Sequence, residues 1–275
     1  MKLSTEHILP IIVLYRAHLH ECPSYLTFLK NSLIQEFMVY DNSPKDFHVD
    51  TTSLDTRAVY QRDIHNGGLS KAYNTAAKYA EEKGYERILL LDQDSTVPPN
   101  ALDSYLQADP SSPLWAPMMI SGENTPFSPV CVNCFNLKAR PTPPGYHALS
   151  VLNPVNSGMC IQIKAFVQAG GYNEKVKLDY ADFEFCKRLR RYFPTFQLLP
   201  LTVQQDFSND NPSPSALIFR HRLYLESAAE CQHTTCLEWL RHQYQICKHT
   251  IALTIKTRSF RTISQYFRFF IFSRP

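Results

Sequence analysis

The stretch ERILLLDQDSTVPPN, residues 86–100, decides the fold of this chain. Its apolar run at 88–91 has no polar alternation, which predicts a buried parallel strand. The two prolines that follow cannot continue a strand. Asp92 and Asp94 therefore follow the strand directly, at the edge where open α/β sheets bind their ligands. Since an extended backbone directs side chains two residues apart to one side, we expect the two carboxylates to converge.

Two interpretations of this carboxylate pair remain open from the residues alone. Paired acidic oxygens at a strand end suit a hard divalent cation that also holds a diphosphate. The same D-x-D pattern also suits a solvated loop that supplies acidic residues to the start of a helix.

Apolar segments upstream of residue 86 alternate between strand and helix patterns. This alternation is typical of a parallel α/β sheet. We expect strands at 8–15, 36–40, 57–61 and 88–91, and helices at 24–34 and 71–84. Downstream, we expect strands at 114–120, 130–137, 155–163 and 196–203, helices at 164–169 and 179–192, and helical structure from Ser215 onward.

Composition excludes several classes of protein. The 275 residues are 44% hydrophobic and 19% charged, with a net charge of +3, which is too small to indicate nucleic-acid binding. No stretch reaches the ~18 apolar residues that cross a bilayer, and the N-terminus lacks a secretion signal. Eight cysteines include a single C-x-x-C pair, so no zinc site is expected. A disulfide framework is not expected in a chain of this length without a secretion signal. We expect a cytoplasmic protein.

The charge is unevenly distributed along the chain. After Glu238 there are seven Lys or Arg and no Asp or Glu. From Arg258 onward these cations alternate with aromatic and aliphatic residues, a pattern that suits the surface of an anionic membrane. It equally suits docking onto the domain itself or onto a second subunit, as in a homodimer.

Three further groups of residues stand where ligands bind in such sheets. Asp41 follows the second expected strand, although an Asp there can also simply form a turn. Asn66, Gly67 and Gly68 precede a helix, whose N-terminus offers amides to an anion. Acids at 179–184 precede a basic run at 187–191, which also fits ordinary compensation of the helix dipole.

Taken together, five motifs resemble those of a family 2 glycosyltransferase, most closely its rhamnosyltransferase-like branch. The matching segments are VYDNS at 39–43, NGGLSKAYNTAAKYA at 66–80, LLLDQDS at 89–95, NSGMCIQIKAFVQAGGYNE at 156–174 and DYADFEFCKRLR at 179–190. The resemblance implies the GT-A fold, a Rossmann-like mixed sheet flanked by helices that binds a nucleotide-diphospho-sugar. We expect this domain at 1–224 and a basic, aromatic helical extension at 225–275.

The resemblance assigns the donor site. Tyr15 lines the nucleotide pocket, Asp41 holds the base, and Asn66 and Gly67 border the nucleotide. The D-x-D element, Asp92 with Asp94, contacts the ribose and binds Mg²⁺ or Mn²⁺ between the phosphates.

The resemblance also assigns the chemistry. Asp182 matches the catalytic base of an inverting transfer, which takes the proton of the acceptor hydroxyl. Asp179 is the rival base, three residues away and on the same expected helical face. Arg220 and Arg222 match a basic segment that meets diphosphate oxygens, although a solvated helix face explains them equally well.

One position departs from the family. Many relatives have a metal-binding His where Gln205 stands in this chain. Either Asp206 replaces that ligand, or fewer protein groups hold the metal, or dependence on the metal is weak.

The sequence thus predicts an inverting glycosyltransferase that moves a sugar from a nucleotide-diphospho-sugar, dTDP-rhamnose being the donor that the branch suggests. Its expected acceptor is a glycan or lipid-linked glycan in bacterial surface polysaccharide synthesis, at the inner face of the cell membrane. The alternatives are a catalytically weak glycan-binding or scaffolding relative and a sugar nucleotidyltransferase. The latter lacks here the early glycine-rich, basic phosphate loop that it needs.

Overall fold

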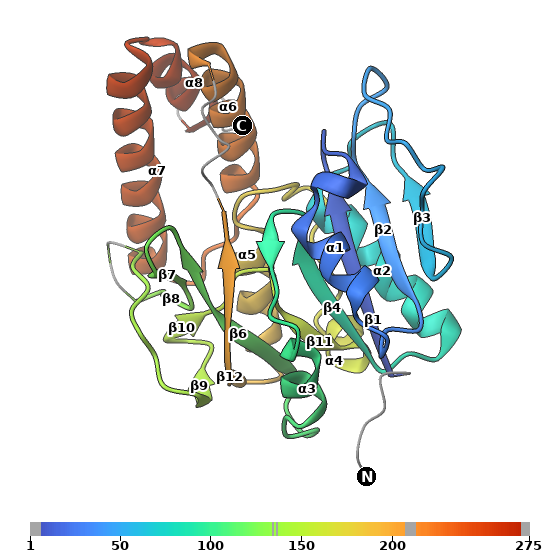
Figure 1. The fold of residues 1–275 in the computed structure, drawn as a ribbon. Helices are drawn as coiled ribbons and strands as arrows, with labels where there is room; N and C mark the ends of the chain where they lie inside the picture. The colour runs from blue at the N-terminus through green and yellow to red at the C-terminus, as the bar shows by residue number, and fades with distance from the viewer. Residues whose placement is uncertain (1–6, 134, 136, 207–212, 271–275) are drawn as a thin grey trace.

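The fold is built around one mixed sheet, seen in Figure 1. The structure, a computed structural model, describes residues 7–133, 135, 137–206 and 213–270. The strand order in the sheet is β3-β2-β1-β4-β11-β6-β12-β5, with β7 paired to β6 and β9 paired to β12. Its strands are β1 (Ile8–Leu14), β2 (Phe37–Asp41), β3 (Ala58–Arg62), β4 (Arg87–Asp92), β5 (Ser95–Thr96), β6 (Leu114–Ser121), β7 (Thr125–Ser128), β9 (Gly145–Ala148), β11 (Cys160–Gln162) and β12 (Thr195–Gln205).

The N-terminal half of this sheet is parallel, as expected from the strand–helix alternation. β1 pairs in parallel with β2 and with β4, and β2 with β3. Strand β11 then joins β4 and β6 in antiparallel register, which makes the sheet mixed. The carboxyl ends of β1, β2 and β4 therefore meet at one edge, where ligands bind in open α/β sheets.

Helices cover both faces of the sheet because its strands are apolar on both sides. Along β1, Leu9, Ile11 and Val13 pack into one core, while Ile8, Ile12 and Leu14 pack into the other. The first core takes its helical residues from α2 (Leu69–Lys83), α4 (Ile163–Gln168) and α5 (Ala181–Leu189), and the second from α1 (Pro23–Lys30) and α3 (Ala101–Leu106). A short 3₁₀ helix, η2 (Leu19–Glu21), precedes α1, and β8 (Val130–Cys131) pairs with β10 (Leu152–Asn153) apart from the main sheet.

Three helices follow the sheet and pack on one another: α6 (Pro214–Ala229), α7 (Cys236–Thr257) and α8 (Arg261–Phe270). They stand beside the end of β12 (Figure 1). Leu225, Ala228 and Ile246 form their small core. The boundary expected between residues 224 and 225 falls inside α6.

Several expected elements differ in extent from those observed. The strand expected at 155–163 is reduced to Cys160–Gln162, because α4 begins at Ile163. The strand expected at 130–137 is reduced in the described residues to Val130–Cys131. The helix expected from Asp179 begins instead at Ala181, after Tyr180 in a left-handed conformation with φ of 67°. Among the described residues, no helix is long and apolar enough to cross a membrane.

Candidate active site

Asp92 and Asp94 do converge, but a turn brings them together rather than an extended backbone. Strand β4 ends at Asp92, and the chain turns at Gln93 and Asp94 into the short strand β5. Strand β5 pairs antiparallel with the end of β12, with Ser95 opposite Gln205. This pairing places the side chain of Gln205 directly beside the two carboxylates.

The Gln205 amide lies between the two acids. Its Nε2 donates to Oδ2 of Asp92 at 3.2 Å and to Oδ1 of Asp94 at 2.9 Å. Gln205 is 6% exposed. The amide thus holds together two carboxylates that would otherwise repel each other.

The charge balance of this pair is unusual. Burial, and in second place the negative charge of Asp94, raises the pKa of Asp92 to about 7, and the Gln205 hydrogen bond only partly opposes this. A site that makes a carboxylate hard to ionise favours a compensating positive charge.

These residues fit a divalent cation shared with a substrate. Among the described residues, no cluster of three or more His, Cys, Asp or Glu forms a metal site. Mg²⁺, however, is commonly held by one or two carboxylates together with substrate phosphates. Asp92 and Asp94 supply that pair, and the side-chain oxygen of Gln205 would become a neutral third ligand if the amide turned over.

Two serines fix the backbone of the turn. Ser24 Oγ donates to the carbonyls of Asp92 (2.6 Å) and Ser95 (2.9 Å). Ser157 Oγ accepts from the Asp92 amide at 3.2 Å and shares a hydrogen bond of 2.6 Å with Ser95 Oγ. The carboxylates therefore sit on a rigid support, as catalytic groups require.

Gln93, the middle residue of the D-x-D element, holds Tyr15 in place. The Tyr15 amide donates to Gln93 Oε1 at 2.8 Å, and Gln93 Nε2 donates back to the Tyr15 carbonyl at 3.3 Å. Tyr15 is 44% exposed beside the D-x-D turn.

Asp41 lies at the end of β2 but is completely buried. Its Oδ1 accepts from the Ser43 amide at 2.8 Å, and its Oδ2 accepts from the Tyr60 hydroxyl at 2.6 Å. Arg62 Nε lies 3.8 Å from the same Oδ2 atom of Asp41. Because these groups already occupy the carboxylate, a nucleobase would reach Asp41 only after Tyr60 moves.

The Asn66–Gly67 loop is organised by Asp63, a residue that the sequence did not single out. The Asp63 carboxylate accepts from the His65 and Gly67 amides at 3.0 and 3.2 Å, and from Lys71 Nζ at 2.7 Å. A Cβ on Gly67 would lie 2.3 Å from Cδ of Lys71 and 2.8 Å from Oδ2 of Asp63, so a larger residue here would displace the Lys71–Asp63 pair.

The N-terminus of α2 is not the open anion site that the glycines suggested. The Leu69 amide donates to the Lys177 carbonyl at 2.7 Å, and the Ser70 hydroxyl donates to the Val176 carbonyl. The backbone carbonyls of residues 176 and 177 thus accept hydrogen bonds that an anion would otherwise accept at this helix end.

Asp182 lies in the first turn of α5 and is partly buried. Burial, followed by the negative charges of Asp179 and Asp92, raises the pKa of Asp182 to about 7, against a hydrogen bond of 2.8 Å from the Phe183 amide. Asp92 and Asp182 also both raise the pKa of the fully buried Tyr73 hydroxyl, beyond the larger effect of burial. Asp182 and Asp92 thus lie within electrostatic reach of each other.

Asp179 is not on the same helical face as Asp182, because it precedes α5. Instead it binds the Arg220 guanidinium from α6, at 3.0 Å to Nη2 and 3.3 Å to Nε. Arg222 pairs with Glu226 on the same helix. Since residues two apart on a helix do not face the same way, Arg220 and Arg222 are not placed as a joint clamp.

Asp206 follows β12 and is exposed. Its amide lies 3.4 Å from the Asp94 carbonyl, so its backbone is joined to the D-x-D turn.

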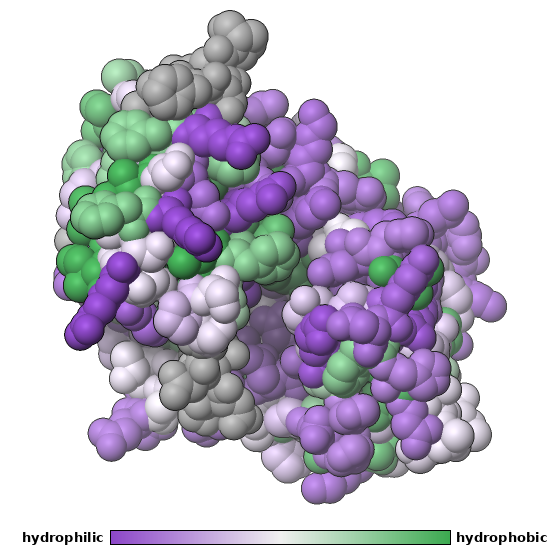
Figure 2. Space-filling view, turned by 90° about the horizontal axis from the view of Figure 1, so that it is seen from above, coloured by the Kyte–Doolittle hydropathy of each residue, from purple (hydrophilic) through white to green (hydrophobic). Residues whose placement is uncertain are grey.

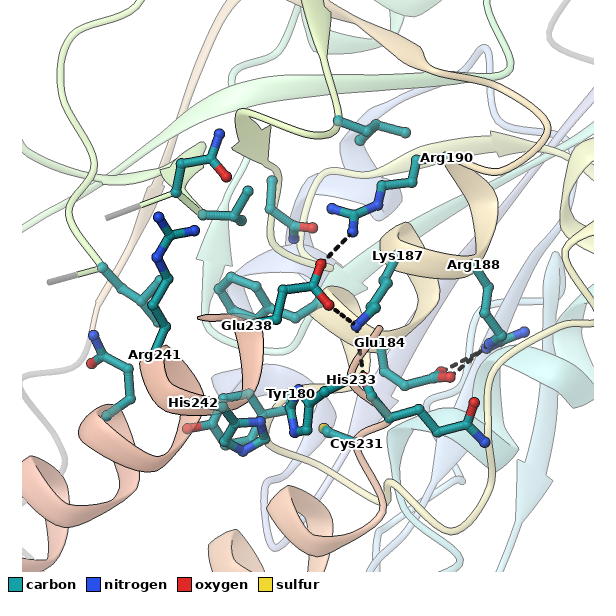
Figure 3. Close-up of a pocket in the computed structure, with 18 of the residues that line it drawn as sticks. Tyr180, Glu184, Lys187, Arg188, Arg190, Cys231, His233, Glu238, Arg241 and His242 are labelled. Atoms are coloured by element: carbon teal, nitrogen blue, oxygen red, sulfur yellow. Dashed lines mark hydrogen bonds and ion pairs between the residues drawn. The ribbon is translucent and has the colours of Figure 1, made fainter. Parts of the chain in front are cut away.

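The carboxyl ends of β1, β2 and β4 and the C-terminal helices border a hollow with hydrophilic walls (Figure 2). A separate pocket of about 160 Å³ lies beside α5 (Figure 3). Tyr180 and Phe183 line it. The Glu238 carboxylate, also in its lining, lies 2.7 Å from Lys187 Nζ and 2.9 Å from Arg190 Nη2.

Some functional candidates escaped the sequence because their signals are contacts between distant segments. Ser24 and Ser157 are ordinary serines in the sequence, 71 and 62 residues from the Ser95 that they contact. Gln93 could have been inferred from its place between the two acids. Asp63 could have been inferred from its position just before the glycine turn.

Comparisons with known proteins agree with this fold. No model of a known protein family matches the chain. The dTDP-rhamnosyl transferase RfbF of Shigella flexneri is 24% identical over 205 residues, which cover 71% of this chain and 67% of that protein. The crystal structure of GalNAc-T7 with UDP, GalNAc and Mn²⁺ superposes with a TM-score of 0.57 at 12% identity, covering 91% of this chain and 57% of that one.

The chain thus has the GT-A fold, which confirms the fold class expected from the five motifs. Its sequence is distantly similar to that of the RfbF rhamnosyltransferase.

Proposed function

We propose that this chain is an inverting glycosyltransferase that transfers rhamnose from dTDP-rhamnose to a hydroxyl of a glycan or lipid-linked glycan acceptor. The observation that carries this proposal is the position of Asp182. Its carboxylate is partly buried, has a pKa of about 7, and is near enough to Asp92 to feel its charge. A base whose pKa lies near the working pH is well suited to proton abstraction.

The donor's diphosphate is placed by this proposal at the turn formed by Asp92 and Asp94. Asp92 and Asp94 would hold Mg²⁺ or Mn²⁺, which offsets negative charge on the departing nucleoside diphosphate. Tyr15 borders the nucleotide from the neighbouring strand end, fixed by Gln93.

In the proposed reaction, Asp182 takes the proton of the acceptor hydroxyl while the oxygen attacks the anomeric carbon from the side opposite the diphosphate. The geometry of such a displacement inverts the configuration at that carbon. Asp179 has a different role in this proposal: bound to Arg220, it adds to the negative charge that keeps the pKa of Asp182 high.

A donor panel tests the proposal. Purified protein is incubated with dTDP-rhamnose, UDP-GlcNAc, UDP-galactose and GDP-mannose, with Mn²⁺ or with EDTA, and release of the nucleoside diphosphate is measured. Release from dTDP-rhamnose well above the others supports the assignment. Release from a different donor would mean that the transferred sugar is not rhamnose. If no donor is bound and none releases its nucleoside diphosphate, the catalytically weak, glycan-binding alternative is favoured.

A further inference from the structure

An apolar stripe runs along the outer side of α7. Its six members recur at intervals of three or four residues, which is the spacing of one face of a helix. They are Leu237, Leu240, Tyr244, Lys248, Ile251 and Ile255, called here the α7 stripe, and all six are exposed. Five of the six are apolar or aromatic, so this face of α7 is water-exposed without being polar.

The fold uses this face at Tyr244, whose ring contacts Phe135, and leaves the other apolar members exposed. The buried residues of α7 are Ile246, Thr250 and Thr257, which lie toward α6 and α8. Large apolar side chains left on a helix face in this way indicate an interaction surface.

Exposure is greatest where α7 ends. Ile255 is 72% exposed, and Phe260, in the turn between α7 and α8, is 80% exposed. Figure 2 looks down on this end of the molecule and shows hydrophobic and hydrophilic side chains interleaved over the C-terminal helices.

The charges around the C-terminal part of the stripe have one sign. Lys256, Arg258 and Arg261 are exposed next to Ile255 and Phe260, and none of the three pairs with an acid among the described residues. Beyond Glu238 the sequence has no acidic residue at all. An exposed apolar face bordered by cations is typical of a helix that lies on an anionic membrane.

The structure also corrects the tail pattern expected from residue 258 onward. Tyr266, Phe269 and Phe270 pack against the small core of the C-terminal helices, so they serve the fold. Phe260 and Phe267 remain exposed. The exposed apolar surface thus lies mainly on α7, upstream of the segment that the sequence indicated.

We propose that the α7 stripe, with Phe260, binds the surface of an anionic lipid bilayer. α7 lies along the membrane, its apolar side chains enter the boundary of the acyl chains, and Lys248, Lys256, Arg258 and Arg261 meet lipid phosphates. A second copy of this chain is a poorer occupant, because a symmetric contact would set Lys248 and its neighbouring cations against the same cations. This inference does not depend on the reaction proposed above.

Vesicle co-sedimentation of the full chain tests it. Vesicles of phosphatidylcholine alone are compared with vesicles containing phosphatidylglycerol, at low and high salt. The apolar variant is I251E/I255E, and the charge variant is K248Q/K256Q. The matched control is L33E/V167E, which places the same charges on two residues that are 45% and 52% exposed elsewhere on the surface. Circular dichroism verifies that each variant is folded.

We expect the wild type and the control to sediment with phosphatidylglycerol vesicles and not with phosphatidylcholine. Each neutralised cation should weaken binding about fivefold, and high salt should weaken it further. I251E/I255E should lose binding at every salt concentration. Equal binding by this variant and the control, or no binding by the wild type, overturns the proposal. A wild-type dimer in solution that I251E/I255E converts to a monomer would assign the stripe to a second copy instead.

Discussion

The Nε2 atom of Gln205 lies 2.9 Å from Oδ1 of Asp94, a residue 111 positions earlier in the chain. The same nitrogen lies 3.2 Å from Asp92. The amide therefore occupies the space between the two carboxylates, where a cation would also find favourable electrostatics. The predictions below begin from this arrangement.

Gln205→Glu should destabilise the protein in EDTA, because three carboxylates would then face each other in one partly buried site. A loss of roughly 2–4 kcal/mol in the free energy of unfolding is expected, and Mn²⁺ should restore much of it because ligand charge strengthens cation binding. Thermal unfolding with and without Mn²⁺ measures both effects. Gln204→Glu, on the exposed neighbour, is the control. A variant that is indifferent to Mn²⁺ would mean that this turn holds no cation.

Asp94→Ala should weaken binding of a nucleoside diphosphate far more than binding of the nucleoside. The reason is that its carboxylate acts on the phosphates through the cation and not on the base. Calorimetry with both ligands in the presence of Mn²⁺ checks this. Equal losses for the two ligands would argue against the metal assignment.

Asp182→Asn should leave donor binding nearly unchanged and slow transfer by ~10²–10⁴-fold, since the amide keeps the shape of the side chain but cannot accept the proton. Asp179→Asn should have a much smaller effect, because Asp179 binds Arg220. Single-turnover assays together with donor titrations measure both. If Asp179→Asn slows transfer strongly and Asp182→Asn slows it only slightly, Asp179 is the base.

The rate should depend on pH through Asp182. Its pKa is raised to about 7, so the carboxylate is protonated, and inactive as a base, below that pH. We expect kcat/KM to fall about tenfold per pH unit below about 7. In Asp179→Asn this fall in kcat/KM should begin at a lower pH, because a negative charge that raises the pKa of Asp182 is gone. A fall that begins at the same pH or at a higher pH would contradict this electrostatic coupling.

Asp63→Ala should destabilise the protein by roughly 2–4 kcal/mol, because it leaves the buried Tyr40 hydroxyl and the partly buried Gly67 amide without an acceptor. Donor binding should weaken as well, since the Asn66–Gly67 loop loses its anchor. Denaturant unfolding measures the first effect, with Asp103→Ala on the exposed face of α3 as the control. A loss no greater than that of the control would show that the loop is held by other contacts.

The sequence by itself determined the parallel core and the location of the acids. Apolar runs at residues 8–14 and 88–91 predict buried strands, and Pro98 and Pro99 cannot continue the second one. Because these signals are local, they can be recognised without knowing the fold. The place of Asp92 and Asp94 at the strand edge follows from them.

The tertiary structure alone decided which groups surround those acids. Gln205 reaches Asp94 because β12 pairs with β5, and Asp41 is sealed because Tyr60 lies on the adjacent strand. Likewise, the α2 N-terminus is covered by Lys177, which is more than a hundred residues away. Hydrogen bonding and desolvation depend on distance in space, so no periodicity in the chain predicts them. Which carboxylate is free to react is for that reason a property of the fold rather than of the motif.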